Sequence, residues 1–195
     1  LFCSKLDFYM LKKAIQQIRK WIDMGMNPVN ISVNQSKIVF YHENYISELK
    51  SLLEEYNVLG SYITLEVLES TVIEDIDMFN SILTEVKKLG FSVSLDDFGS
   101  GYSSLNVLSK LQIDELKIDR IFLHTKSEVD NQRTKWILES IIDIAKKSQI
   151  LVVVEGVESK QDDLFIKNLG ADVGQGYFYG RPLSISAFND LIETK

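Results

Sequence analysis

Apolar residues along the chain follow two alternating spacings, one typical of helices and one typical of strands. Helical spacing predicts helices at about 7–24, 44–59, 76–89, 103–110, 131–147, 161–169 and from about 186 onward. Short β-branched runs predict strands between them, at 29–34, 62–69, 91–97, 115–119, 150–158 and 172–177. We expect Asp7 to cap the first helix and Gly60 to end the second. Strands alternating with helices predict parallel β-α units.

The predicted strands have one aliphatic and one polar face. The aliphatic parity includes Ile63, Leu65, Val93 and Leu95, whereas the other parity is mostly small or polar. Each strand also ends in a polar residue: Asn34, Glu66, Asp96 with Asp97, Lys117 with Asp119, Glu155, and Gln175. In a parallel barrel the aliphatic face packs on the outer helices, and the other face presents its last residues at the carboxyl rim. The pattern therefore predicts a rim of acids with one lysine.

These features favour an α/β fold of the TIM (β/α)8 type, with only about six of the eight strands present in the chain. A doubly wound open sheet is the alternative, since it also places ligands at strand carboxyl ends. It is disfavoured because no GxGxxG or Walker-type loop follows any strand, and because polar ends occur on all six. No linker or low-complexity stretch divides the sequence, so residues 1–195 are expected to form one domain.

Composition narrows the class of partner. The 195 residues are 45% hydrophobic and 25% charged, which is ordinary for a globular protein. No apolar run approaches the ~20 residues of a membrane span, and the first residues do not resemble a signal peptide. The single cysteine fits a reducing compartment, so a cytoplasmic location is expected. The net charge of −7 argues against DNA binding, and an anionic ligand would need metal ions.

The rim residues suit metal-dependent phosphoryl chemistry. Carboxylate and amide oxygens favour Mg²⁺ or Mn²⁺, whereas zinc would call for histidine or cysteine. We expect Asp96 to bridge two ions, with Asn34 and Glu66 on one side and Asp97 and Glu155 on the other. Lys117 would orient the attacking water or a phosphate oxygen. The structural alternatives are a salt bridge from Lys117 to Glu115 or Asp119, and a capped turn at the aspartate pair.

Several stretches, in this order and spacing, resemble the EAL-domain family of bacterial cyclic-di-GMP phosphodiesterases. They are ISVNQS, LEVLES, SLDDFGSGYSSL, LKIDR, VVVEGVES and GADVGQGYFYGRPL. The resemblance covers nearly the whole chain. It implies a modified (β/α)8 barrel that hydrolyses cyclic-di-GMP to linear pGpG with Mg²⁺ or Mn²⁺ and is inhibited by Ca²⁺. It also implies a homodimer, fused to sensor or diguanylate cyclase modules.

The resemblance also implies a role for each matching residue. Asn34, Glu66, Asp96 and Asp97 correspond to metal ligands, and Lys117 to the water-orienting residue. Glu155 corresponds to a ligand of the second ion or to the general base. Asp119, Glu158 and Gln175 correspond to supporting residues of the site. Glu69 corresponds to an anchor of the DDFGSGYSS loop, which couples metal binding to dimerisation.

The sequence also departs from the family pattern. The Glu-Ala-Leu motif is absent before Leu1, so the chain is expected to be a barrel domain truncated at its N-terminus. With that motif go two strands, a metal-ligand glutamate and a phosphate-binding arginine, which upstream residues would supply. An alternative is a degenerate domain that binds cyclic-di-GMP or a protein partner without hydrolysis. A third, weaker alternative is a structural dimerisation domain.

Overall fold

Strand and helix alternate along the chain in the computed structural model, which describes residues 2–69, 76–100, 105–123 and 128–193. The strands are β1 (Ile31–Gln35), β2 (Ile63–Leu68), β3 (Ser92–Phe98), β4 (Glu115–Ile118), β5 (Leu151–Glu155) and β6 (Val173–Gln175). The helices are α1 (Phe2–Asp23), α2 (Lys37–Phe40), α3 (Tyr45–Tyr56), α5 (Ile76–Lys88), α6 (Leu105–Lys110), α7 (Glu128–Lys147), α8 (Lys160–Leu169) and α9 (Ile185–Glu193). Two single-turn 3₁₀ helices are η1 (Gly60–Tyr62) and η2 (Arg120–Phe122).

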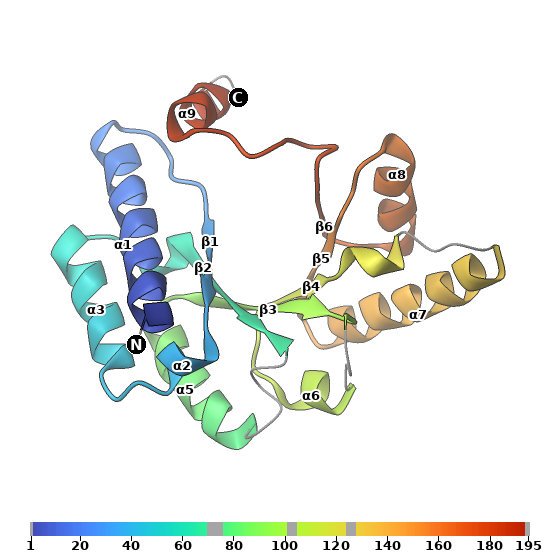
Figure 1. The fold of residues 1–195 in the computed structure, drawn as a ribbon, viewed down its shortest axis with the longest axis horizontal. Coiled ribbons are helices and arrows are strands. Elements are labelled where there is room, and N and C mark those ends of the chain that lie inside the picture. The colour runs from blue at the N-terminus through green and yellow to red at the C-terminus, as the bar shows by residue number, and fades with distance from the viewer. Residues whose placement is uncertain (1, 70–75, 101–104, 124–127, 194–195) are drawn as a thin grey trace.

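All six strands belong to one parallel sheet whose spatial order is the order of the sequence, β1 to β6. The sheet curls into a half-barrel, with the helices that connect its strands on the convex side (Figure 1). Helix α9 lies across the open side, where Asn189 Oδ1 accepts a 2.7 Å hydrogen bond from the Trp21 indole of α1. The sequential order confirms the barrel-type prediction, because a doubly wound sheet would reverse its strand order at a switch point.

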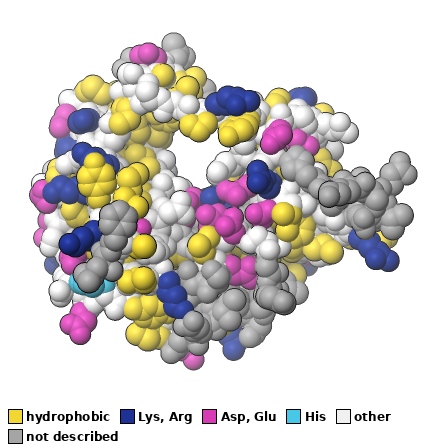
Figure 2. All heavy atoms as spheres, in the orientation of Figure 1, with side chains coloured by type: hydrophobic (Ala, Val, Ile, Leu, Met, Phe, Trp, Pro, Cys, Tyr) yellow, Lys and Arg dark blue, Asp and Glu magenta, His cyan; other side chains and the backbone are white. Residues whose placement is uncertain are grey.

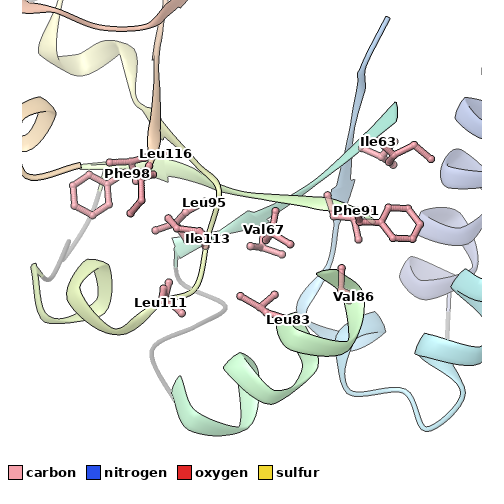
Figure 3. Close-up of a cluster of buried hydrophobic side chains, with 14 of the residues drawn as sticks. Ile63, Val67, Leu83, Val86, Phe91, Leu95, Phe98, Leu111, Ile113 and Leu116 are labelled. Carbon is pink, nitrogen blue, oxygen red and sulfur yellow. The ribbon is translucent and has the colours of Figure 1, made fainter. Parts of the chain in front are cut away.

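The aliphatic face of the sheet forms the core, as its parity predicted. Leu65, Leu95 and Val154 are fully buried. Side chains from the outer helices cover this face, including Leu83 and Val86 of α5 (Figure 3). Burying each such side chain contributes roughly 1.5–3 kcal/mol relative to exposure, so the sheet is held against its helices from one side. The concave face is thereby left to polar residues.

The structure corrects two predicted helix ends. Asp7 is not a cap, because α1 begins at Phe2 and the Asp7 carboxylate instead accepts hydrogen bonds from the backbone and hydroxyl of Ser36. Gly60 does not end α3, because Asn57 adopts a left-handed conformation (φ 49°) and closes that helix first. Asparagine tolerates this conformation better than most residues. Gly60 begins η1.

Three strands differ from the prediction by two or more residues at one end, and the others by one residue. The stretch 29–34 contributes β1 only from Ile31, 150–158 ends at Glu155, and 172–177 ends at Gln175. Gly156 takes a left-handed φ of 74°, which turns the chain out of the sheet directly after Glu155. β5 therefore presents Glu155 as its last residue.

Candidate functional site

Strands β2, β3, β4 and β5 converge on a lysine at the carboxyl end of the sheet. Lys117 Nζ lies 3.1 Å from Glu66 Oε1, 2.9 Å from Asp96 Oδ1 and 2.7 Å from Glu155 Oε1. The Lys117 side chain is only 6% exposed, and the three carboxylates are also largely buried. Figure 2 shows acidic side chains gathered beside the central hollow of the molecule. We call Glu66, Asp96, Lys117 and Glu155 the rim cluster.

An irregularity in β3 brings a second aspartate to the same place. The register between β3 and β4 shifts between Leu95 and Phe98, which face Leu116 and Ile118, so β3 carries one extra residue there. Asp97 has a left-handed φ of 59° at this point. A β-bulge of this kind re-aims side chains that would otherwise alternate between the two faces. Oxygens of Asp96, Asp97 and Glu155 consequently lie within 4.8 Å of one another.

The rim cluster contains more negative than positive charge. Burial raises the pKa of Glu66 and of Glu155, and the Lys117 ammonium only partly opposes these shifts. Burial also raises the pKa of Asp97, with Asp96 and Asp119 adding to the shift. Burial opposes the charge of Lys117 itself, but the Glu155 and Asp96 carboxylates outweigh it, so its pKa is raised. The cluster would therefore be stabilised by additional cations.

The donor set fits an oxygen-preferring divalent cation. Asp96, Asp97 and Glu155 offer carboxylate oxygens alone, which are the ligands that Mg²⁺ and Mn²⁺ prefer. Asp96 Oδ1 is buried, and Lys117 Nζ lies 2.9 Å from it. Because this one ammonium is shared with Glu66 and Glu155, the carboxylates retain oxygens that can bind a metal ion. The EAL-type prediction of a metal-dependent centre is consistent with these residues.

Beside the rim cluster opens a pocket of about 400 Å³, which we call the rim pocket. It is lined by Asp97, Asp119, Arg120, Glu155, Gly156, Glu158, Gln175, Gly176 and Tyr177. The structure thus brings the predicted supporting residues Asp119, Glu158 and Gln175 together with Asp97 and Glu155. Asp119 has a further local contact, because its Oδ1 accepts a 2.7 Å hydrogen bond from the Ile121 N–H at the start of η2.

Two predicted site residues, Asn34 and Glu69, do not line the rim pocket. Asn34 is level with Glu66 in the β1–β2 register, but it is exposed and lines a separate groove of about 670 Å³ between α1, β1 and α9. Glu69 is buried, while part of the loop that it is predicted to anchor, residues 101–104, lies outside the described residues. The roles of Asn34 and Glu69 stay predictions.

The alternative partners expected for Lys117 are wrong. Its ion pairs run to Glu66, Asp96 and Glu155 on other strands, and not to Glu115 or Asp119 on its own segment. The sequence interpretation also assigned no role to Arg120, which the structure places in the rim pocket. Arg120 directly follows the predicted site residue Asp119, and this neighbourhood could have indicated it. Strand parity could not, because it does not extend into the 3₁₀ turn.

The chain matches relatives over most of its length. It is 35% identical to the bifunctional diguanylate cyclase/cyclic di-GMP phosphodiesterase MucR of Pseudomonas aeruginosa over 90% of this chain and 25% of that protein. It is 32% identical to the cyclic di-GMP phosphodiesterase PdeR of Escherichia coli, over 94% of this chain and 27% of that protein. The chain thus spans about a quarter of the length of these curated relatives. No helix within the described residues has the length and apolar character needed to cross a membrane.

Solved structures with the same fold support the relationship. A structure of the P. aeruginosa MucR phosphodiesterase in complex with c-di-GMP is 32% identical, with a TM-score of 0.83 over 94% of this chain and 79% of that chain. The EAL domain of Mycobacterium smegmatis DcpA is 27% identical, with a TM-score of 0.89 over 100% of this chain and 86% of that chain. The sequence model of the EAL domain family matches residues 2–182 of this chain. The chain belongs to the EAL domain family.

Proposed function

We propose that this chain is a phosphodiesterase domain that hydrolyses cyclic-di-GMP to linear pGpG. The observation that carries the proposal is the group formed by Asp96, Asp97 and Glu155, which is adjacent to Lys117 and borders a pocket. The names of MucR and PdeR as cyclic di-GMP phosphodiesterases support it. The c-di-GMP complex of the MucR phosphodiesterase supports the choice of substrate.

We propose Mg²⁺ or Mn²⁺ as the activating ions and Ca²⁺ as an inhibitor. Asp96, Asp97 and Glu155 would hold an ion, and Asn34 and Glu66 would complete a two-ion site. Two such ions, when bound, supply Lewis acidity and a water of lowered pKa for in-line attack on a phosphate. The all-oxygen donor set and its excess negative charge support this choice of metal.

The chain's own residues would position and move protons. Lys117 keeps its proton, because the surrounding carboxylates raise its pKa, so it can donate a hydrogen bond but cannot serve as a base. It would orient the attacking water or a phosphate oxygen. Glu155 would act as a metal ligand or as the general base. Hydrolysis forms a bond from the water oxygen to phosphorus and breaks the bond from phosphorus to O3′, which takes up a proton.

We further propose that the domain acts in the bacterial cytoplasm as a homodimer and is fused to sensor or cyclase modules. The length of the curated relatives supports fusion, since the chain spans about a quarter of MucR and 22% of the oxygen sensor protein DosP of Escherichia coli. A combination of sensor and catalytic modules would let an external signal control turnover.

Incubation with cyclic-di-GMP and Mg²⁺ or Mn²⁺ tests the function, with nucleotide products separated by chromatography in the presence and absence of Ca²⁺. We expect pGpG, and less of it when Ca²⁺ is present. Binding measured by calorimetry without any product would instead establish the degenerate binding domain. Absence of both binding and product overturns the proposed function.

A further inference from the structure

Among the described residues that line the rim pocket, Arg120 carries the single cationic side chain. Arg120 lines this pocket together with four acids, Asp97, Asp119, Glu155 and Glu158. A phosphodiester ligand carries negative charge, which these carboxylates repel. Besides Lys117 of the rim cluster and any bound cations, Arg120 is therefore the residue of this pocket whose charge attracts such a ligand.

The backbone of Arg120 is fixed by the single turn of η2. Asp119 Oδ1 caps this turn by accepting from the Ile121 N–H, and the Arg120 carbonyl accepts a 2.9 Å hydrogen bond from the Leu123 N–H. Asp119 thus has one oxygen engaged in holding the turn that carries Arg120. The position of this arginine is set by local structure on the pocket wall.

The stem of Arg120 packs against the turn that follows Glu155. A Cβ added to Gly156 would lie 2.2 Å from the Arg120 Cβ and 3.4 Å from its Cγ, so only glycine permits this contact. Gly156 also has a left-handed φ of 74°, which other residues rarely adopt. The absence of a side chain at Gly156 lets the arginine stem lie one residue away from a member of the rim cluster.

The guanidinium of Arg120 has no partner among the residues that the structure describes. Arg120 is exposed, and in the described part of the chain its side chain makes no ion pair or hydrogen bond, although four carboxylates share its pocket. Lys117, by contrast, contacts three carboxylates. A guanidinium offers a planar fork of N–H donors that matches the oxygens of a phosphate.

We infer that Arg120 is a substrate-binding residue whose guanidinium contacts a phosphate oxygen of the cyclic dinucleotide. This inference rests on the proposed function and adds a protein contact outside the carboxylate group. The contact forms in the bound ground state, so it acts on affinity and KM more than on kcat. Because it is an interaction between charges, salt weakens it.

The test compares Arg120→Gln and Arg120→Lys with a matched control, Arg133→Gln, at an exposed arginine of α7. Affinity for cyclic-di-GMP is measured by calorimetry with Ca²⁺ at several salt concentrations, and KM and kcat are measured with Mg²⁺. We expect Arg120→Gln to weaken binding by about tenfold and to raise KM similarly, with kcat within about twofold. Arg120→Lys should recover part of the loss, and binding by Arg120→Gln should depend less on salt.

The outcomes separate this inference from the proposed function. If the wild-type chain neither binds nor hydrolyses cyclic-di-GMP, the proposed function fails, and the inference fails with it. If the wild type binds and Arg120→Gln behaves like Arg133→Gln, only the inference is overturned. A loss of affinity with an unchanged salt dependence would mean that the guanidinium contacts a guanine base of the ligand, and it would overturn the phosphate contact.

Discussion

Within the described residues, the rim cluster and a group on α8 each pair buried carboxylate with lysine, and they differ in their balance of charge. In the rim cluster, the Lys117 ammonium forms ion pairs with three carboxylates. Burial raises the pKa of Glu66 and Glu155 there. In the second group, on α8, a single carboxylate is surrounded by donors. Asp163 is 1% exposed and lies 2.9 Å from Lys160 Nζ and 2.8 Å from Lys167 Nζ.

In the α8 group, both oxygens of the Asp163 carboxylate contact donors. The Tyr179 hydroxyl donates a third bond to Asp163, 2.8 Å long, and the bonds from Lys167, Lys160 and Tyr179 hold the Asp163 pKa well below its usual range. The Tyr179 pKa rises to about 12, because burial and Asp163 both disfavour its ionised form. This group joins α8 to the segment after β6 and needs nothing further. The comparison teaches that a buried acid is a candidate ligand when its neighbours leave it short of donors.

The largest expected effect is on turnover at the rim cluster. Asp96→Asn should lower kcat for cyclic-di-GMP by at least about 100-fold, because it removes a carboxylate charge that the metal centre needs. Glu155→Ala should have a similar effect. Steady-state hydrolysis with Mn²⁺ measures both. Asp163→Asn is the matched control and should stay within a few-fold of the wild type, whereas an active Asp96→Asn rules out the two-metal assignment.

The second prediction concerns stability without metal. Lys117→Met leaves three buried carboxylates without their cation, so the free energy of unfolding in chelator should fall by about 3 kcal/mol. Thermal unfolding with and without Mn²⁺ checks this. We expect Mn²⁺ to raise the Tm of Lys117→Met more than that of the wild type. An equal shift would mean that the lysine and the ions do not share the same carboxylates.

The third prediction concerns the α8 group, where metal should have no influence. Asp163→Asn should lower the Tm by roughly a few degrees, by the same amount with and without Mn²⁺. The Asp163 pKa is lower in the folded chain than in the unfolded chain. Its contribution is therefore fully present above about pH 4 and is lost as the pH falls through the folded value. Melting curves below pH 4 should show the variant approaching the wild type, and a constant gap would contradict the ion-pair explanation.

The smallest expected effect is the pH dependence of the rim cluster. Its acids have raised pKa values in the folded chain, so their contribution to stability is present below the unfolded pKa and is lost as the pH rises through the folded one. Metal binding offsets that loss. The rise in Tm caused by Mn²⁺ should thus be a few degrees larger at pH 8 than at pH 5.5. A larger rise at the lower pH would contradict the raised pKa values.

Strand parity made most of this fold predictable. An aliphatic residue at every second position, such as Val93 and Leu95, identifies the buried face whatever the neighbouring strand is. The polar ends at Glu66 and Glu155 identify the rim in the same way. That pattern predicted a barrel-type parallel sheet, and the strand order β1 to β6 confirms it.

The contacts within the site were not predictable, because they depend on register and backbone irregularity. A regular strand would send Asp96 and Asp97 to opposite faces, and the extra residue that brings them together is not visible in the residue pattern. The partners of Lys117 come from three other strands, so the nearby acids of its own segment were misleading. Arg120 lies in a turn beyond the strand, where no periodicity applies.

The extra residue in β3 also determines how this site can be lost in evolution. Loss of the Asp97 codon would let β3 pair regularly with β4 and would remove one carboxylate from the rim, while the aliphatic core residues stay as they are. On the proposed function, an active domain and a form that keeps its core but has a depleted site differ by one in-frame deletion of three nucleotides. In this architecture the chemistry can therefore be lost far more easily than the fold.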